Sequence, residues 1–230
     1  MNKNSIILLC ISLSFFLLKC NSGDAEKKIN AIKIVQEEVK DTINLRTDII
    51  PISKDGVVNA VIEIPAGTLD KWELDKSTGK VKWEYIDKKP RIVNYIGYPG
   101  NYGMIPRTLL SKENGGDGDP LDILVLGPPA ERGSVVKCKI IGVLFLMDRG
   151  EQDDKLIAVS DNSPLYDVQD ISDLNKNYNG ISEIIALWFT NYKGVNKMES
   201  KGFGSKEIAE DLLRDAITDY KLNDTKHNKE

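Results

Sequence analysis

Short runs of β-branched and other apolar residues, broken by glycine, proline and turn residues, constrain the fold of this chain more than any other feature. Runs of this length and composition favour strands with at least one buried face. Several such strands in succession must bury their apolar faces against one another. The pattern therefore predicts a small β-barrel or a curled sheet. The runs occupy residues 57–65, 71–74, 81–86, 121–126, 135–146 and 156–159.

Two amphipathic helices are predicted after the strands, which makes the class mainly β with α (α+β), with helices packed outside the barrel. Ser205 is placed to cap the second helix. Residues 90–110 instead hold six glycine or proline breaks and three tyrosines, and this favours a shaped loop. The first helical face comprises Ile181, Ile184, Ile185, Trp188, Phe189 and Tyr192, and the second comprises Ile208, Leu212, Leu213, Ala216, Ile217 and Tyr220.

The N-terminus has the form of an export signal. Lys3 supplies a positive charge, and an apolar run from Ile6 to Leu18 has the length of a signal-peptide core rather than of a membrane span. Because this run ends at Cys20, it resembles a bacterial lipoprotein signal, although Lys19 stands where a small residue is usual. The alternatives are an ordinary secretory signal or an uncleaved anchor.

The chain of 230 residues is therefore divided into four parts. Residues 1–19 form the signal peptide, 20–54 a tether and lead-in, 55–222 the folded domain, and 223–230 a polar tail. Lipidation at Cys20 would anchor the protein to a membrane without spanning it. We expect an exported protein, lipid-anchored to a bacterial membrane on its periplasmic or surface side.

Histidine and cysteine are too scarce for several kinds of active site. The single histidine, His227, lies in the polar tail. Cys10 leaves with the signal peptide and Cys20 would carry lipid, so only Cys138 remains, as a small core residue. This excludes an internal disulfide and argues against a Ser-His-Asp triad, a Cys-His dyad and a histidine-rich zinc site. Any chemistry must rest on acidic, basic and tyrosine side chains, which suit hard cations and phosphate oxygens.

The segment GGDGDPLDILVLG, residues 115–127, places three carboxylates against the edge of a buried strand. Asp117, Asp119 and Asp122 repel one another unless a cation lies between them. Pro120 and the glycines bend the loop tightly. Oxygen ligands alone select Mg²⁺, Mn²⁺ or Ca²⁺, and the spacing is not that of an EF-hand. We favour a metal site over a solvated acidic turn.

A second acidic group, MDRGEQDDK, ends the strand at 135–146. Alone it would be read as a solvated hairpin turn, but it repeats the design of acids at a strand end beside a glycine. Two acidic rims on one barrel could hold several metal ions, which commonly clamp the oxygens of an in-line phosphoryl displacement. Spacing alone does not select the phosphate-binding groups from the 31 basic residues. The candidates are Lys71, Arg91, Lys155 and Lys193, with Tyr98, Tyr102 and Tyr192 as hydroxyl donors.

These motifs together resemble the soluble, family I inorganic pyrophosphatases. DGDPLDIL matches the family signature Asp-x-Asp-Pro-apolar-Asp at every fixed position. The resemblance covers residues 55–222 and implies a five-stranded, OB-like β-barrel with flanking helices. It also implies a homo-oligomeric enzyme that hydrolyses pyrophosphate to two phosphates, with several Mg²⁺ ions per site and Mn²⁺ as a substitute. The other motifs, in the family's order, are VIEIP, KWELDK, GYPGNYGMIP, MDRGEQDDK and NYK.

The resemblance also implies a role for each site residue. Asp119 would be the catalytic general base. One departure is Arg149, which stands where the family usually has an acidic residue and changes the local field. The metal ligands would be Glu63, Glu73, Asp117, Asp122, Asp148 and Asp153, and the substrate-binding residues Lys71, Arg91, Tyr102, Lys155, Tyr192 and Lys193.

Two other functions are alternatives to this hypothesis. The first is a non-catalytic, divalent-metal-binding lipoprotein on the same barrel, which the full set of acids and phosphate-binding groups disfavours. The second is an OB-like barrel that binds oligonucleotides or sugars. A net charge of −4 disfavours nucleic acid. The expected partners are therefore pyrophosphate and, through the lipid anchor, a membrane.

Overall fold

The computed structural model describes residues 43–112 and 116–227. The expected signal peptide, the lipidation site at Cys20 and most of the tether lie outside these residues. Within the described part of the chain, no helix combines the length and apolar character that crossing a bilayer requires.

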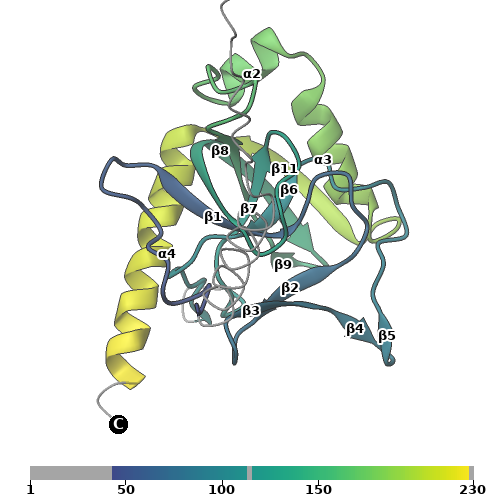
Figure 1. The fold of residues 1–230 in the computed structure, drawn as a ribbon. Helices are drawn as coiled ribbons and strands as arrows, with labels where there is room; N and C mark the ends of the chain where they lie inside the picture. The colour runs from purple at the N-terminus through teal and green to yellow at the C-terminus, as the bar shows by residue number, and fades with distance from the viewer. Residues whose placement is uncertain (1–42, 113–115, 228–230) are drawn as a thin grey trace, which may run out of the picture. The chain divides into compact units, whose positions relative to one another are not determined.

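Five strands close into a barrel, as predicted (Figure 1). Neighbouring strands run antiparallel except β7 and β10, which are parallel, with Leu156 opposite Ile123. The long strand β8 closes the ring because its first part pairs with β1 and its later part pairs with β10. In order around the ring, the strands are β1 (Val58–Ile64), β6 (Asn101–Met104), β7 (Asp122–Leu126), β10 (Lys155–Ser160) and β8 (Val135–Asp148).

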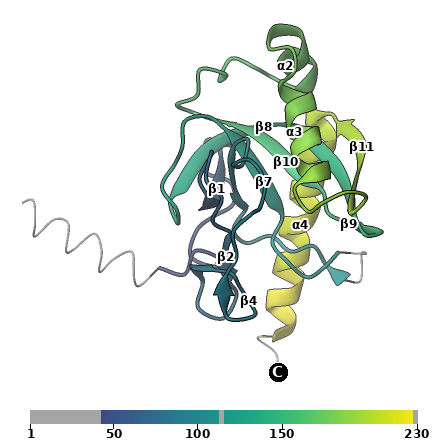
Figure 2. The ribbon, with the colours of Figure 1, turned by 90° about the vertical axis from the view of Figure 1, so that its right-hand side faces the viewer.

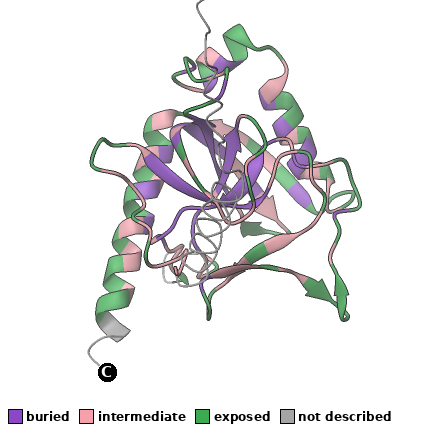
Figure 3. Ribbon diagram, viewed as in Figure 1, coloured by how far each residue is buried: buried purple, intermediate pink, exposed green. Residues whose placement is uncertain are grey.

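The core occupies both faces of these strands. Every residue of β1 and β10 is buried (Figure 3). Alternate residues of β7 belong to two clusters: Leu124 and Leu126 pack in a cluster with the residues of the first predicted helix, and Ile123 and Val125 in a cluster with those of the second. Cys138 is fully buried in the second cluster, which confirms its predicted place in the core.

Two additional strands pair with β8 outside the ring. Strand β11 (Met198–Gly204) pairs along its later half, and β9 (Glu151–Gln152) forms a hairpin with its end. Neither was predicted. Strand β6 also overturns the prediction of a loop throughout residues 90–110. A Cβ on Gly103 would lie 1.9 Å from the carbonyl oxygen of Val61, so β6 and β1 approach too closely for any other residue.

In the part of the chain that the structure describes, three helices cover the barrel: α2 (Ile171–Asn177), which was not predicted, α3 (Ile181–Asn191) and α4 (Lys206–His227). Figure 2 shows α2 at one end of the molecule and the C-terminal end of α4 at the other. Helix α4 packs on β8. The predicted faces are wrong at Ile184 and Ile208, which are 57% and 44% exposed.

The buried positions of these helices explain the two errors. The buried face of α3 is centred on Ile185, Trp188 and Phe189, so Ile184 falls at its margin. On α4, alanines at 209 and 216 are buried together with Leu213. Small residues let that helix approach the sheet closely, and the predicted apolar face did not include Ala209. Ser205 directly precedes α4, and its hydroxyl donates to the Glu207 carboxylate at 2.6 Å.

A pair of hairpins projects beside one end of the barrel, and we call it the arm (Figure 1). Trp72 and Trp83 stack across its first hairpin, with ring centroids 5.3 Å apart. Arg132 lies over Trp72 at 4.2 Å and donates to the Glu63 carbonyl oxygen at 3.2 Å, which ties the arm to β1. The run predicted at 81–86 is split between two strands. The arm comprises β2 (Trp72–Asp75), β3 (Lys80–Trp83), β4 (Tyr85–Ile86) and β5 (Lys89–Pro90).

Candidate active site

Carboxylates line a hollow between the end of the barrel and the arm, which we call the acidic hollow. Its volume is about 690 Å³. Eight acidic side chains line it against only three lysines. The acids are Glu63, Glu73, Asp75, Glu84, Asp117, Asp119, Asp122 and Asp153, and the lysines are Lys71, Lys76 and Lys82.

A smaller hollow, which we call the basic hollow, has the opposite balance of charge. Four cationic side chains line it against two carboxylates. It shares Lys71, Tyr102 and Asp153 with the acidic hollow, so the two hollows adjoin. A site with one acidic and one basic side suits a cation and a polyanion bound next to each other. The cations are Lys71, Arg91, Arg149 and Lys193, the acids Asp148 and Asp153, and the hydroxyls Tyr102 and Tyr192.

The barrel brings the acids together through the parallel pair of strands. Asp122 is the first residue of β7, and Lys155 is the first residue of β10. Because these strands run in the same direction and pair directly, both side chains emerge at the same end of the barrel. Asp153 lies two residues before Lys155 and donates its backbone N–H to the Leu146 carbonyl oxygen at 2.9 Å.

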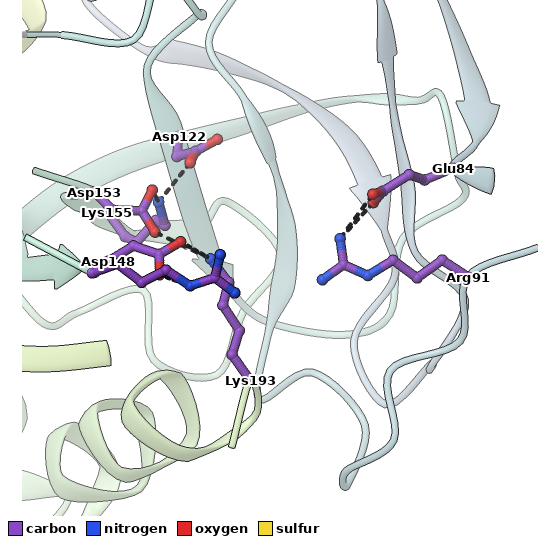
Figure 4. Close-up of polar contacts among 8 residues, drawn as sticks. Glu84, Arg91, Asp122, Asp148, Asp153, Lys155 and Lys193 are labelled. Atoms are coloured by element: carbon purple, nitrogen blue, oxygen red, sulfur yellow. Dashed lines mark hydrogen bonds and ion pairs between the residues drawn. The ribbon is translucent and has the colours of Figure 1, made fainter. Parts of the chain in front are cut away.

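Lys155 lies beneath the two hollows and joins their acids. It is 2% exposed. Its Nζ donates to Asp122 Oδ2 at 2.6 Å and also to the Asp153 carboxylate (Figure 4). Burial alone would lower the pKa of this ammonium, but the two carboxylates outweigh burial and hold its pKa above the usual value. Lys155 therefore stays charged and fixes the separation of Asp122 and Asp153.

The basic hollow has two preformed ion pairs on its walls. Lys193 donates to Asp148 Oδ2 at 2.6 Å, and Arg91 Nη1 donates to both carboxylate oxygens of Glu84, at 2.9 Å to Oε1 and 2.8 Å to Oε2 (Figure 4). Asp148 Oδ1 is buried, and no donor of the described residues lies within hydrogen-bond distance of it. A buried carboxylate oxygen without a hydrogen bond is costly, so this atom is available to a ligand.

Negative charge is incompletely compensated in the acidic hollow. Burial raises the pKa of Glu63 to about 7, against the opposing effect of Lys71. Burial also raises the pKa of Asp117, and the nearby charge of Asp122 adds to this rise. Glu63 Oε1 accepts a hydrogen bond from the Leu74 N–H at 2.7 Å, which orients the carboxylate from the arm.

These acids fit a hard divalent cation. All their potential metal-binding atoms are carboxylate oxygens, the ligands that Mg²⁺ prefers. One of these oxygens, Asp148 Oδ1, accepts no hydrogen bond. In the described part of the chain, no three acidic, histidine or cysteine side chains surround a single point. Asp122, Asp148 and Asp153 instead contact lysines.

Asp119 is held in the loop before β7. Its backbone N–H donates to Asp117 Oδ1 at 2.8 Å, which closes a tight turn. Its carboxylate pairs with Lys76, carried by the turn between β2 and β3. Both side chains are about half exposed. Asp119 can therefore reach the contents of the acidic hollow.

An aromatic cluster supports the tyrosine side of the site. Trp188 stacks on Tyr192 with centroids 4.5 Å apart and donates from Nε1 to the Ile96 carbonyl oxygen at 2.9 Å. Burial raises the pKa of Tyr102 and of Tyr192, so both hydroxyls keep their protons and can donate to an anion at neutral pH. Tyr98, considered as a hydroxyl donor, is 3% exposed and packs against Trp188 at 4.3 Å, which is a core position.

The predicted site residues are brought together. All of them line one of the two hollows except Lys155, which lies below. Their individual roles remain predictions. Sequence reasoning missed four charged lining residues, although the first two stand at the end of the motif KWELDK: Asp75, Lys76, Lys82 and Glu84.

Comparison with known proteins gives consistent matches. The family model described as inorganic pyrophosphatase matches residues 60–221. An inorganic pyrophosphatase from Corynebacterium efficiens is 40% identical over 169 residues, covering 71% of this chain and 98% of that protein. A soluble inorganic pyrophosphatase from Zea mays is 37% identical over 170 residues, covering 70% and 67%.

Solved structures agree with the sequence matches. The type I inorganic pyrophosphatase from P falciparum has a TM-score of 0.73 at 30% identity, covering 81% of this chain and 67% of that one. The inorganic pyrophosphatase from Thermus thermophilus has a TM-score of 0.66 at 32% identity, covering 78% and 99%.

Proposed function

The chain belongs to the family of inorganic pyrophosphatases and is an inorganic diphosphatase; from this premise we propose how its residues divide the work and where it acts. Pyrophosphate is a dense anion that repels an attacking hydroxide. Divalent cations, when bound, neutralise part of that charge and lower the pKa of water. The observation that carries the proposal is the pairing of an acidic hollow with a basic hollow through shared residues.

The acidic hollow would hold several Mg²⁺ ions, with Mn²⁺ as a substitute. Lys155 keeps two of its acids at a fixed separation. Asp148 offers its Oδ1, which accepts no hydrogen bond, from the rim of the basic hollow. Carboxylates alone also leave room for water around each ion, which Mg²⁺ retains in proteins. The proposed ligands are Glu63, Glu73, Asp117, Asp122, Asp148 and Asp153.

Asp119 would act as the general base. It takes a proton from the attacking water while the water oxygen forms a bond to one phosphorus. The bond between that phosphorus and the bridging oxygen then breaks, and the second phosphate leaves with the bridging oxygen. Such proton transfer contributes about 10²–10⁴-fold to rate.

The basic hollow would bind the phosphates. Lys71, Arg91 and Lys193 supply cations, and Tyr102 and Tyr192 supply hydroxyl donors held by the aromatic cluster. Arginine suits a phosphoryl group because its planar fork can donate two parallel hydrogen bonds. Lys155 would act from beneath, by keeping the acids in place and adding positive charge below the phosphates.

The assay measures phosphate release from pyrophosphate by the detergent-solubilised full chain, with Mg²⁺ or with excess chelator. We expect release only with Mg²⁺, and a fall in kcat of at least about 100-fold in Asp119→Asn. Asp211→Asn is the matched control, because Asp211 pairs with Arg214 on the surface of α4. Wild-type release no faster than that of Asp119→Asn would overturn the proposal. Calorimetric Mg²⁺ binding without turnover would instead support a non-catalytic, metal-binding lipoprotein.

We also propose that the enzyme is exported, lipid-anchored at Cys20 and homo-oligomeric. The support is the N-terminal signal sequence and the resemblance to the family. Mass spectrometry of the N-terminus should find residues 1–19 removed and a diacylglyceryl-type mass on Cys20, and Cys20→Ala should move the protein from the membrane to the soluble fraction. An unmodified N-terminus at Met1 would contradict this. Sedimentation velocity tests the oligomer.

A further inference from the structure

Arg149 lies in a turn that aims a cation at the basic hollow. It joins β8 to β9 with Gly150, and both residues have positive φ angles, 52° and 95°. Its backbone N–H donates to the Lys197 carbonyl oxygen at 3.0 Å, which fixes the turn against the segment after α3. A two-residue turn of this geometry normally takes Asn-Gly, so arginine is not the residue that the backbone favours.

The other cations of the basic hollow already have partners. Lys193 is paired with Asp148 and Arg91 with Glu84, and Lys71 lies over the Tyr102 ring at 5.6 Å. The Arg149 side chain is 72% exposed, and its ion pair with Asp148 is long: Nε lies 4.0 Å from Oδ1, too far for a hydrogen bond. Its guanidinium therefore has most of its donors available.

An adjoining hollow strengthens the case for an anion. Arg149, Arg91, Lys193 and Lys197 line it, and no acidic residue of the described chain does. Like charges gathered in this way repel one another, and a bound anion would turn that repulsion into attraction.

We propose that Arg149 is a further substrate-binding residue, which donates to phosphoryl oxygens of a pyrophosphate-class anion in the basic hollow. This rests on the proposed function, because it takes the basic hollow as the phosphate side of that site. The guanidinium would approach from the β8–β9 turn, and that of Arg91 from the segment directly after the arm. Two arginines from separate elements would then hold one phosphate-bearing ligand between them.

The test compares Arg149→Asn with Lys88→Asn in the full chain. Lys88 also has a positive φ in an exposed hairpin turn, at 62°, so its variant removes the same charge from the same kind of position. Asparagine is well tolerated at positive φ, so neither variant should lower the melting temperature. The ligand is methylenediphosphonate, a pyrophosphate analogue that cannot be hydrolysed, titrated calorimetrically in the presence of Mg²⁺.

We expect Kd for methylenediphosphonate to rise about tenfold in Arg149→Asn and to stay within about twofold in Lys88→Asn. KM for pyrophosphate should rise in parallel, with kcat within about threefold, and Arg149→Lys should recover part of the affinity. A Kd within twofold of wild type in Arg149→Asn, or an equal rise in Lys88→Asn, would overturn the proposal.

The two proposals fail in different ways. If the wild type binds methylenediphosphonate through Arg149 but releases no phosphate from pyrophosphate, the proposed function fails and the anion contact stands. If the wild type hydrolyses pyrophosphate and Arg149→Asn is unchanged in both Kd and KM, the anion contact fails alone.

Discussion

Replacing Lys155 by methionine tests whether one buried cation holds the acidic rim of the barrel together. Methionine fills nearly the same volume without the charge. In the wild type, Lys155 Nζ contacts Asp122 and Asp153, whose side chains are only 29% and 23% exposed. The variant would leave two neighbouring carboxylates to repel each other with little water to solvate them.

The structure sets the expected magnitude. Removing one partner of a buried ion pair typically costs about 3–5 kcal/mol of unfolding free energy. Because both aspartates keep some contact with water, we expect the lower end, about 3 kcal/mol. For a domain of this size, that corresponds to a fall in melting temperature of roughly 6–12 °C.

The assay is urea unfolding of the full chain in excess chelator, so that bound cations do not mask the effect. Lys201→Met is the matched control, because Lys201 pairs with Glu199 at 2.6 Å on the surface, where both side chains are more than half exposed. Its loss should cost less than about 1 kcal/mol. The double variant Lys155→Met with Asp153→Asn should regain part of the loss. If Lys155→Met were as stable as Lys201→Met, the argument from buried charge would be refuted.

Three further predictions follow from burial and close approach. In excess chelator, burial raises the pKa of Glu63 to about 7 in the folded chain, against about 4.5 in the unfolded chain. The stability that the protonated side chain contributes is therefore fully present below pH 4.5 and is lost as pH rises through 7. Glu63→Gln should add about 2–3 kcal/mol of unfolding free energy at pH 8 and almost nothing at pH 4. Burial raises the pKa of Cys138 to about 12, so peptide mapping after iodoacetamide treatment at pH 8 should find it alkylated at least about 100-fold more slowly in native protein than in urea. Gly103→Ala should cost about 3 kcal/mol or prevent folding, whereas Gly150→Ala, with open space around its Cβ, should cost only about 1 kcal/mol in urea unfolding.

Sequence pattern predicted the strands whose residues form an apolar or β-branched run, including the first hairpin of the arm. Strand β6 escaped because its residues have other tasks. The Asn101 side chain accepts from the backbone N–H groups of Ala66 and Ala130 and donates to the Pro128 carbonyl oxygen, so it fastens two loops while almost fully buried. Gly103 is required by the approach of β1, and Tyr102 faces the hollows. None of these residues produces an apolar alternation, so the segment reads as a loop.

Strand β11 escaped for a different reason. Its sequence, MESKGFG, is mostly polar, and only Met198 and Gly204 are buried. Its pairing depends on the length of β8, a strand distant in the sequence. The local composition of the segment therefore does not predict this pairing.

Motifs predicted residues that the structure brings to the two hollows, but they did not predict the electrostatic arrangement of those residues. Spacing could not show that Lys155 lies beneath Asp122 and Asp153, since the contact depends on the parallel register of β7 and β10. Nor could it show that Arg91 has a partner in Glu84 across the arm. The charge balance of a hollow depends on residues that lie far apart in the sequence, so it cannot be predicted from local spacing.

Closure of the barrel through β8 has a consequence for how the enzyme would fail on heating. Asp122, Asp148 and Lys155 are each the terminal residue of a strand in a ring that has no free edge between β1, β6, β7, β10 and β8. The backbone at Asp122 or Lys155 cannot move away without opening hydrogen-bonded ladders on both sides of its strand. Activity and cooperative unfolding should therefore disappear over the same interval of temperature, with no inactive yet folded intermediate between them.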